Sequence, residues 1–188
     1  RFASVPMVQR RAECSIHPSR VHWQSRYYDE LFDFDGPRNE NVESACHNYL
    51  EALEWTMLYY TRGCVDWRWR YKYHYAPLFQ DIMRVVPCFN TALVRVQDPP
   101  RRPVAPLVLL SYVTPAHNLR ALLPAALADK LLDEHPEWYM RDWAFRWAYC
   151  RYFWEAHAVM NEIDLAALER HVEEHLRPSA RLGSASDA

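Results

Sequence analysis

The strongest hydrophobic pattern in the chain lies between residues 41 and 62. Apolar side chains recur there at steps of three and four residues, which places them on one face of an α-helix; they are Val42, Cys46, Tyr49, Leu53, Met57 and Tyr60. Gly63 follows at the position where a left-handed residue often ends a helix, and Asn39 is placed to cap the start. The pattern therefore predicts one long helix, from about residue 41 to 62, with a single apolar stripe.

Weaker apolar patterns predict several further helices. They cover about residues 24–32, 78–86, 106–113, 125–133 and 136–141, with a last helix from a capping Asp164 to about His175. Residues 33–37 have the chemistry of a turn, Pro87 ends the second of these helices, and residues 97–103 form a proline-rich connector.

Other stretches are expected to lie outside regular helices. Residues 143–159 fit either a hairpin or an extended crossing, because their period does not decide between the two. The segment from Trp67 to Pro77 is expected to be extended or to form turns. Residues 1–21 are predicted to be an irregular, basic lead-in and residues 177–188 a disordered tail. One helical domain, residues 22–176, remains between them.

Composition narrows the fold class and the range of functions. The 188 residues include three glycines and thirteen prolines, which disfavours a turn-rich β sandwich and favours helices punctuated by proline. We therefore expect a mainly α fold, in which irregular aromatic-rich and proline-rich connectors join several helices. The net charge of −2 lacks the basic excess of an autonomous nucleic-acid binder, so any contact with nucleic acid must be local.

The cysteines favour a reducing environment. There are five of them, at positions 14, 46, 64, 88 and 150, and none forms a Cys-x-x-Cys pair. An odd number without that spacing indicates free thiols rather than a disulfide framework or a zinc ribbon. No apolar run has the length of a membrane span, and no signal peptide opens the sequence. We expect an intracellular protein, cytoplasmic or nuclear.

Aromatic and cationic residues alternate directly after the long predicted helix. The run Asp66-Trp-Arg-Trp-Arg-Tyr-Lys-Tyr-His-Tyr-Ala-Pro77 is preceded by Arg62. Aromatic faces can stack on nucleobases while the interleaved cations meet phosphates, so such a strip suits a single strand of nucleic acid. The competing interpretation is an aromatic core whose cations extend to solvent along their aliphatic stems.

The order of these residues resembles the second conserved region of the XRN family of 5'-3' exoribonucleases. The positions in register, without a gap, are Tyr49, Leu53, Trp55, Leu58, Tyr59, Tyr60, Gly63, Trp67, Trp69, Tyr71, Tyr73, His74, Tyr75, Ala76 and Pro77. Upstream, the run Trp23-Gln-Ser-Arg-Tyr-Tyr28 is similar to the family's entry to this region. Downstream, parts of residues 103–124 and 153–168 are similar to its later motifs. The resemblance covers about residues 22 to 172.

The sequence also departs from the family pattern. Thr61 replaces the third tyrosine of a Tyr-Tyr-Tyr run, Asp66 replaces a serine, and Lys72 replaces a proline. Val108 and Leu109 stand where the family has polar residues. The aromatic spacing that identifies the family is unchanged.

The resemblance implies a part of an enzyme that hydrolyses phosphodiester bonds. Its family degrades single-stranded RNA with a 5' monophosphate and uses Mg²⁺ held by acidic residues of a first conserved region, which nothing in this chain matches. The chain is therefore expected to pack on the N-terminal nuclease region of the same protein, to shape its active-site pocket, and to be inactive alone, with no catalytic residue or metal ligand of its own. The alternative is a non-catalytic RNA-binding or protein-docking scaffold.

The same resemblance assigns the residues of the strip. Trp67 and Trp69 are the stacking candidates, Tyr71, Tyr73, His74 and Tyr75 would form the wall, and Arg62, Arg68, Arg70 and Lys72 would contact phosphates. His74 is equally compatible with a partly buried imidazole that is hydrogen-bonded to the backbone.

Two further clusters have the composition of metal sites. His171 to His175 matches the inverted zinc-protease pattern His-x-x-Glu-His. Only Asp187 supplies an acid among the residues that follow, so we expect a solvated helix end. Asp29, Glu30, Asp33 and Asp35 form a dense acidic cluster, for which solvated carboxylates are expected rather than a cation site.

Overall fold

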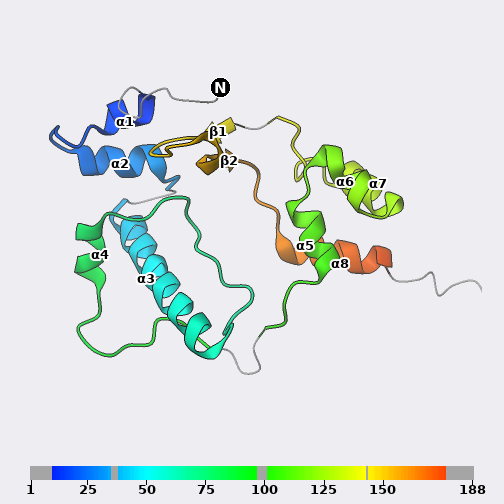
Figure 1. Cartoon of the computed structure of the whole chain (residues 1–188), viewed down its shortest axis with the longest axis horizontal. Helices are drawn as coiled ribbons and strands as arrows, with labels where there is room; N and C mark the ends of the chain where they lie inside the picture. Colours follow the sequence, from blue (N-terminus) through cyan, green and yellow to red (C-terminus); the bar gives the residue numbers. More distant parts are fainter. Residues whose placement is uncertain (1–9, 35–37, 97–100, 143, 177–188) are drawn as a thin grey trace, which may run out of the picture. The chain divides into compact units, whose positions relative to one another are not determined.

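Helices dominate the structure, a computed structural model that describes residues 10–34, 38–96, 101–142 and 144–176 (Figure 1). The mainly α fold expected from the sequence is confirmed. The chain divides into two compact units, a first unit of residues 1–103 and 145–157 and a second unit of residues 104–144 and 158–188. It passes between them along β1 (Ala144–Arg146) and β2 (His157–Val159), which pair in a two-stranded sheet. This pairing favours the hairpin over the extended crossing.

Three helices frame the first unit: α2 (Trp23–Leu31), α3 (Arg38–Arg62) and α4 (Phe79–Val85). Each matches a predicted helix to within a few residues. Helix α3 begins at Arg38, so Asn39 lies inside its first turn and the prediction that Asn39 caps the helix is wrong. At the other end, Gly63 has φ of 89° and its N–H donates to Tyr59 O at 3.1 Å. This left-handed end is the one that glycine favours.

A short helix, α1 (Arg11–Ile16), lies within the stretch expected to be irregular. Contacts distant in sequence hold it, which local patterns do not reveal. The Glu13 carboxylate accepts a hydrogen bond from the Tyr149 N–H at 2.7 Å. The Arg10 guanidinium lies 4.0 Å from the centre of the Trp147 ring and donates to Trp147 O at 3.1 Å.

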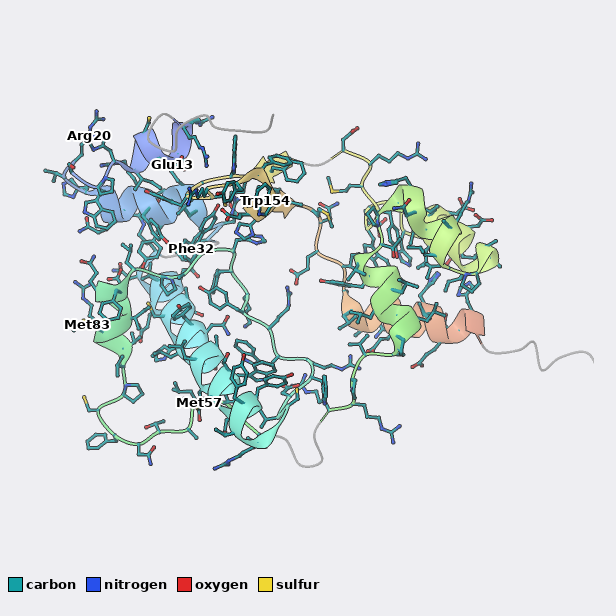
Figure 2. The ribbon with its side chains drawn as sticks, in the orientation of Figure 1. Glu13, Arg20, Phe32, Met57, Met83 and Trp154 are labelled. Atoms are coloured by element: carbon teal, nitrogen blue, oxygen red, sulfur yellow. The ribbon has the colours of Figure 1, made fainter. Side chains whose placement is uncertain are left out.

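The apolar stripe of α3 is covered along only part of its length. Its N-terminal part packs into the first unit's core, where Cys46 is buried and Val42 is half-buried. Its C-terminal part is exposed: Leu53 is 54%, Met57 65% and Tyr60 80% accessible. Figure 2 shows Met57 near the C-terminal end of α3. The sequence pattern predicts the helix correctly, but half of its stripe has no cover within the described residues.

The second unit is a small helical cluster. It contains α5 (Pro106–Val113), the 3₁₀ helix η2 (Ala116–Asn118), α6 (Leu119–Leu122), α7 (Ala125–Glu134) and α8 (Leu165–Leu176). Asp164 caps α8 as predicted, since its Oδ1 accepts the N–H groups of Ala166 at 2.9 Å and Ala167 at 3.3 Å.

The predicted helix at residues 136–141 is wrong. This segment forms turns, with hydrogen bonds from Trp138 N–H to His135 O and from Tyr139 N–H to Pro136 O. Tyr139 is buried and its hydroxyl donates to Ser111 O at 3.1 Å. A tertiary contact therefore fixes this segment, and the local sequence does not show it.

Candidate nucleic-acid interface

The aromatic strip, residues 67–75, adopts an extended and irregular path, as expected. From Arg70 onward its side chains alternate between two sides. Tyr71, Tyr73 and Tyr75 are half-buried, whereas Arg70, Lys72 and His74 are exposed. An extended backbone points successive side chains to opposite sides. The three tyrosines thus anchor the strip, and the three cationic or titratable side chains face outward.

Hydroxyl and ring contacts fix the tyrosines in place. Tyr71 donates to Tyr75 O at 2.8 Å and packs edge-on against Tyr49 at a centroid distance of 5.7 Å. Tyr75 donates to Ala148 O at 3.1 Å. Tyr73 packs against Phe32 at a centroid distance of 5.6 Å. Burial raises the pKa of Tyr75 to about 12 and that of Tyr71 further, so both hydroxyls stay protonated donors.

The two tryptophans occupy different environments. Trp69 is half-buried and stacks on Trp55 with a centroid distance of 5.7 Å and an interplanar angle of 20°. Trp55 also stacks on Tyr59 and donates from Nε1 to Asp66 O at 3.0 Å. Trp67 is 53% accessible, and no described ring stacks on it. Of the two stacking candidates, Trp67 presents an indole to solvent, while one face of Trp69 is already covered.

Polar contacts hold the backbone that carries the cations. The Lys72 N–H donates to Asn48 Oδ1 at 2.9 Å, and the buried Asp66 carboxylate accepts the Arg68 N–H at 2.8 Å. The Arg68 side chain donates to Arg102 O at 3.3 Å. Arg62 ends α3 and is exposed. The strip's backbone is therefore fixed, and the charged ends of Lys72 and Arg62 extend into solvent.

His74 lies beside a second histidine. Its ring centre is 5.1 Å from that of His157. Desolvation, then the neighbouring His157 and Arg146, lower the pKa of His74 below 6.5, and Asp33 opposes them. The imidazole is thus held mainly neutral near pH 7, which makes it a hydrogen-bonding group rather than a phosphate cation.

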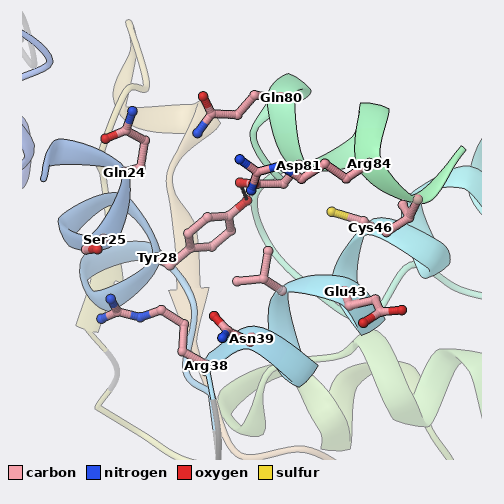
Figure 3. Close-up of a pocket in the computed structure, with 12 residues that line it drawn as sticks. Gln24, Ser25, Tyr28, Arg38, Asn39, Glu43, Cys46, Gln80, Asp81 and Arg84 are labelled. Carbon is pink, nitrogen blue, oxygen red and sulfur yellow. Dashed lines mark hydrogen bonds and ion pairs between the residues drawn. The ribbon is translucent and has the colours of Figure 1, made fainter.

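A pocket of about 430 Å³ opens between α2, α3 and α4 (Figure 3). On one wall, the buried Tyr28 hydroxyl donates to Asp81 Oδ2 at 2.8 Å, and Arg84 pairs with Asp81 at 2.8 Å. Arg38 pairs with Asp29 nearby. Burial raises the pKa of the Cys46 thiol to about 11, so it is a poor nucleophile. Three of the charged residues that line this pocket, Arg38, Asp81 and Arg84, form ion pairs. Sequence patterns do not reveal the pocket because its residues come from three separate helices.

The two predicted metal-like clusters have different outcomes. Asp33 pairs with Arg146 at 2.7 Å and Asp29 with Arg38, while Asp35 lies outside the described residues. Solvated, ion-paired carboxylates match the expectation. The expectation of a solvated helix end at His171 is wrong, because only 7% of that residue is accessible. Glu134, the last residue of α7, and His135 lie against His171, and the sequence around the two histidines does not contain these contacts.

Comparison with known proteins identifies the family of the chain. A family model, the Xrn1 helical domain, matches residues 15–179. The chain belongs to the Xrn1 helical domain family. This agrees with the family resemblance of the aromatic strip and with the helical fold of both units.

The chain also resembles curated exoribonucleases. It is 26% identical over 174 residues to 5'-3' exoribonuclease 1 of Schizosaccharomyces pombe, which covers 87% of the chain and 12% of that protein. To 5'-3' exoribonuclease 2 of Aspergillus fumigatus it is 30% identical over 184 residues, 89% of the chain and 16% of the relative. To 5'-3' exoribonuclease 2 of Gallus gallus it is 28% identical over 158 residues, 81% and 16%. The chain spans less than a fifth of these relatives. Among the described helices, none is both long and apolar enough to cross a membrane.

Proposed function

We propose that this chain is part of a 5'-3' exoribonuclease and corresponds to the second conserved region of that family. In this proposal it packs on the N-terminal nuclease region of the same protein and forms one wall of the pocket that receives single-stranded RNA with a 5' monophosphate. The Mg²⁺ ions that polarise the phosphodiester and activate water belong to the nuclease region. The chain itself contributes shape and positive charge, and we expect no hydrolysis by the chain alone.

The observation that carries the proposal is the fixed, two-sided strip. Half-buried tyrosines anchor one side of residues 70–75, the other side presents Arg70, Lys72 and His74, and Trp67, three residues before Arg70, has an exposed indole. Stacking on a base requires a free aromatic face, and positioning a strand requires cations near its phosphates. A fixed backbone strengthens binding to such a wall, because less conformational freedom is lost when RNA binds.

The exposed half of the α3 stripe supports docking on the rest of the protein. Leu53, Met57 and Tyr60 lie one to two helical turns apart and present apolar surface to solvent. Contiguous exposed apolar surface is typical of interaction sites, and these three residues share one face of α3. The relatives are several times longer than this chain, so the parent protein has other regions to cover it.

The test is a charge placed in the proposed interface of the full-length protein. Met57→Glu should abolish most of the RNA degradation while leaving the thermal midpoint of the isolated chain unchanged, because Met57 is already solvated there. Met83→Glu on α4 is the matched control, since Met83 has nearly the same exposure on a neighbouring helix (Figure 2).

Equal activity of the Met57→Glu and wild-type proteins would contradict the docking surface. Hydrolysis of 5'-monophosphorylated RNA by the isolated chain with Mg²⁺ would contradict the assignment of catalysis to the nuclease region.

A further inference from the structure

The second unit brings one carboxylate and two imidazoles together. Glu134 is the last residue of α7, and His171 and His175 lie one turn apart on α8. One carboxylate oxygen and one ring nitrogen from each histidine lie within 4.8 Å of one another. Among the described residues, this is the one group of three or more such side chains close enough to share an ion.

His171 lacks the hydrogen bonds that a buried imidazole normally makes. Its Nε2 is buried and has no hydrogen-bond partner among the described residues. Its Nδ1 lies 3.6 Å from Glu134 Oε2, which is beyond hydrogen-bond length. A buried polar ring with unmet bonding capacity calls for an explanation, and a metal ion supplies one.

His175 also has a ring nitrogen available to bind a metal ion. His175 Nδ1 lies 2.8 Å from His171 O, so in its neutral form Nδ1–H donates to that carbonyl and leaves the Nε2 lone pair open. Such a hydrogen bond to the non-ligating nitrogen accompanies most metal-bound histidines. The two histidine rings lie 4.3 Å apart.

We propose that Glu134, His171 and His175 bind one divalent transition-metal ion, with zinc the best fit. Two imidazoles and one carboxylate match the ligands of zinc, whereas calcium and magnesium require oxygen ligands. The bound ion links the C-terminal end of α7 to α8 and thereby stabilises the fold of the second unit. The proposal is a binding site and assigns no hydrolytic role to Glu174.

The required geometry is within reach of the side chains. A tetrahedral zinc ion with bonds of about 2.0–2.1 Å separates its ligand atoms by about 3.3 Å. The ligand atoms, which lie within 4.8 Å of one another, therefore have to approach by at most about 1.5 Å. Glu134 and His175 are exposed, and Glu134 pairs with Lys130 Nζ through Oε1 at 3.0 Å, so its Oε2 stays on the side of the buried His171.

Zinc titration of the 188-residue chain, stripped with a chelator, tests the proposal. We expect one zinc ion per chain, measured by competition with a chromophoric chelator, and an increase in the thermal midpoint when zinc is added. Cobalt should bind at the same site and give visible absorption bands that zinc abolishes. Glu134→Gln and His175→Ala should each weaken zinc binding at least tenfold.

The two residues to be replaced, Glu134 and His175, lie outside the buried core of the second unit. Glu134 and His175 are both exposed, so their replacement leaves the packing of α7 and α8 unchanged. His117→Ala is the matched control, because His117 is an exposed histidine of η2 in the same unit. Absence of stoichiometric zinc binding by the wild type would overturn the proposal. Wild-type affinity in both Glu134→Gln and His175→Ala, or an equal loss in His117→Ala, would also overturn it.

Discussion

The two units build their cores from different kinds of side chain. The second unit's core is mainly aliphatic, with Leu119, Leu131, Leu168 and Val172 almost fully buried between helices. The first unit's core is largely aromatic, and Tyr28 and Phe32 are buried there against further rings from the strip. Aliphatic packing needs only complementary shape. Aromatic packing with tyrosine also requires that each buried hydroxyl find a partner.

Because the two cores differ, we expect substitutions in the two units to affect different properties of the protein. In the helices of the aliphatic unit the exposed large apolar side chains are aliphatic, at Leu109, Val113 and Leu122. The aromatic unit fixes Tyr71 and Tyr75 by hydrogen bonds and leaves Trp67 and half of α3 exposed. A buried residue of the second unit should therefore act mainly on folding, and the exposed Trp67 and Met57 of the first unit should act mainly on activity.

The largest effect expected from this comparison is the loss of an aliphatic core residue. Leu131→Ala should reduce the free energy of unfolding by about 2–5 kcal/mol, because Leu131 is fully buried and its removal leaves a cavity. Leu53→Ala, at an exposed position of α3, should change it by less than about 0.5 kcal/mol. Urea denaturation followed by circular dichroism measures both. Equal destabilisation would show that α3 is covered in the isolated chain.

A smaller effect tests the polar part of the aromatic core. Tyr28→Phe removes the hydroxyl that donates to Asp81 Oδ2 at 2.8 Å and accepts the Leu78 N–H at 3.0 Å. Two groups lose their partner, so the free energy of unfolding should fall by about 1–3 kcal/mol. Tyr60→Phe is the control, since Tyr60 is mostly exposed. An equal decrease in the free energy of unfolding in both variants would show that the buried hydroxyl contributes no more than an exposed one.

The smallest effect is a pH dependence of the first unit. Because His74 has a folded pKa below 6.5, folding favours its neutral form. The stability that depends on His74 is complete above about pH 6.5 and falls as the pH drops from there toward the lowered folded value. Thermal midpoints of wild type and His74→Gln at pH 7.5 and pH 5.5 measure it. The variant should lose less stability on acidification, and identical losses would contradict the prediction.

Local periodicity made most of the helices predictable. The stripe of α3, Gly63 and the capping Asp164 are signals within a few residues. The structure confirms the end of α3 at Arg62 and the start of α8 after Asp164, whereas α3 begins before the predicted residue 41. Helix α1 and the turns at residues 136–139 were not predictable in this way. Contacts of Glu13 with Tyr149, and of Tyr139 with Ser111, determine them across long stretches of sequence.

The sequence predicts which residues form the aromatic strip, but it does not predict which of their side chains are exposed to solvent. The sequence gives the order of rings and cations, and family membership rests on that order. It does not show which tryptophan is covered, because Trp69 is stacked by Trp55, fourteen positions earlier. For the same reason the local pattern around His171 could not include Glu134, which reaches it from α7.

The most direct test compares Trp67→Ala with Trp69→Ala in the full-length protein. Binding of 5'-monophosphorylated single-stranded RNA and the thermal midpoint are measured on both variants. We predict that Trp67→Ala weakens RNA binding by about 1–3 kcal/mol with an unchanged midpoint, because Trp67 is half exposed. Trp69→Ala should cost up to about 3–5 kcal/mol of stability, because its half-buried ring is stacked on Trp55. Unchanged RNA binding by a stable Trp67→Ala protein would contradict the account.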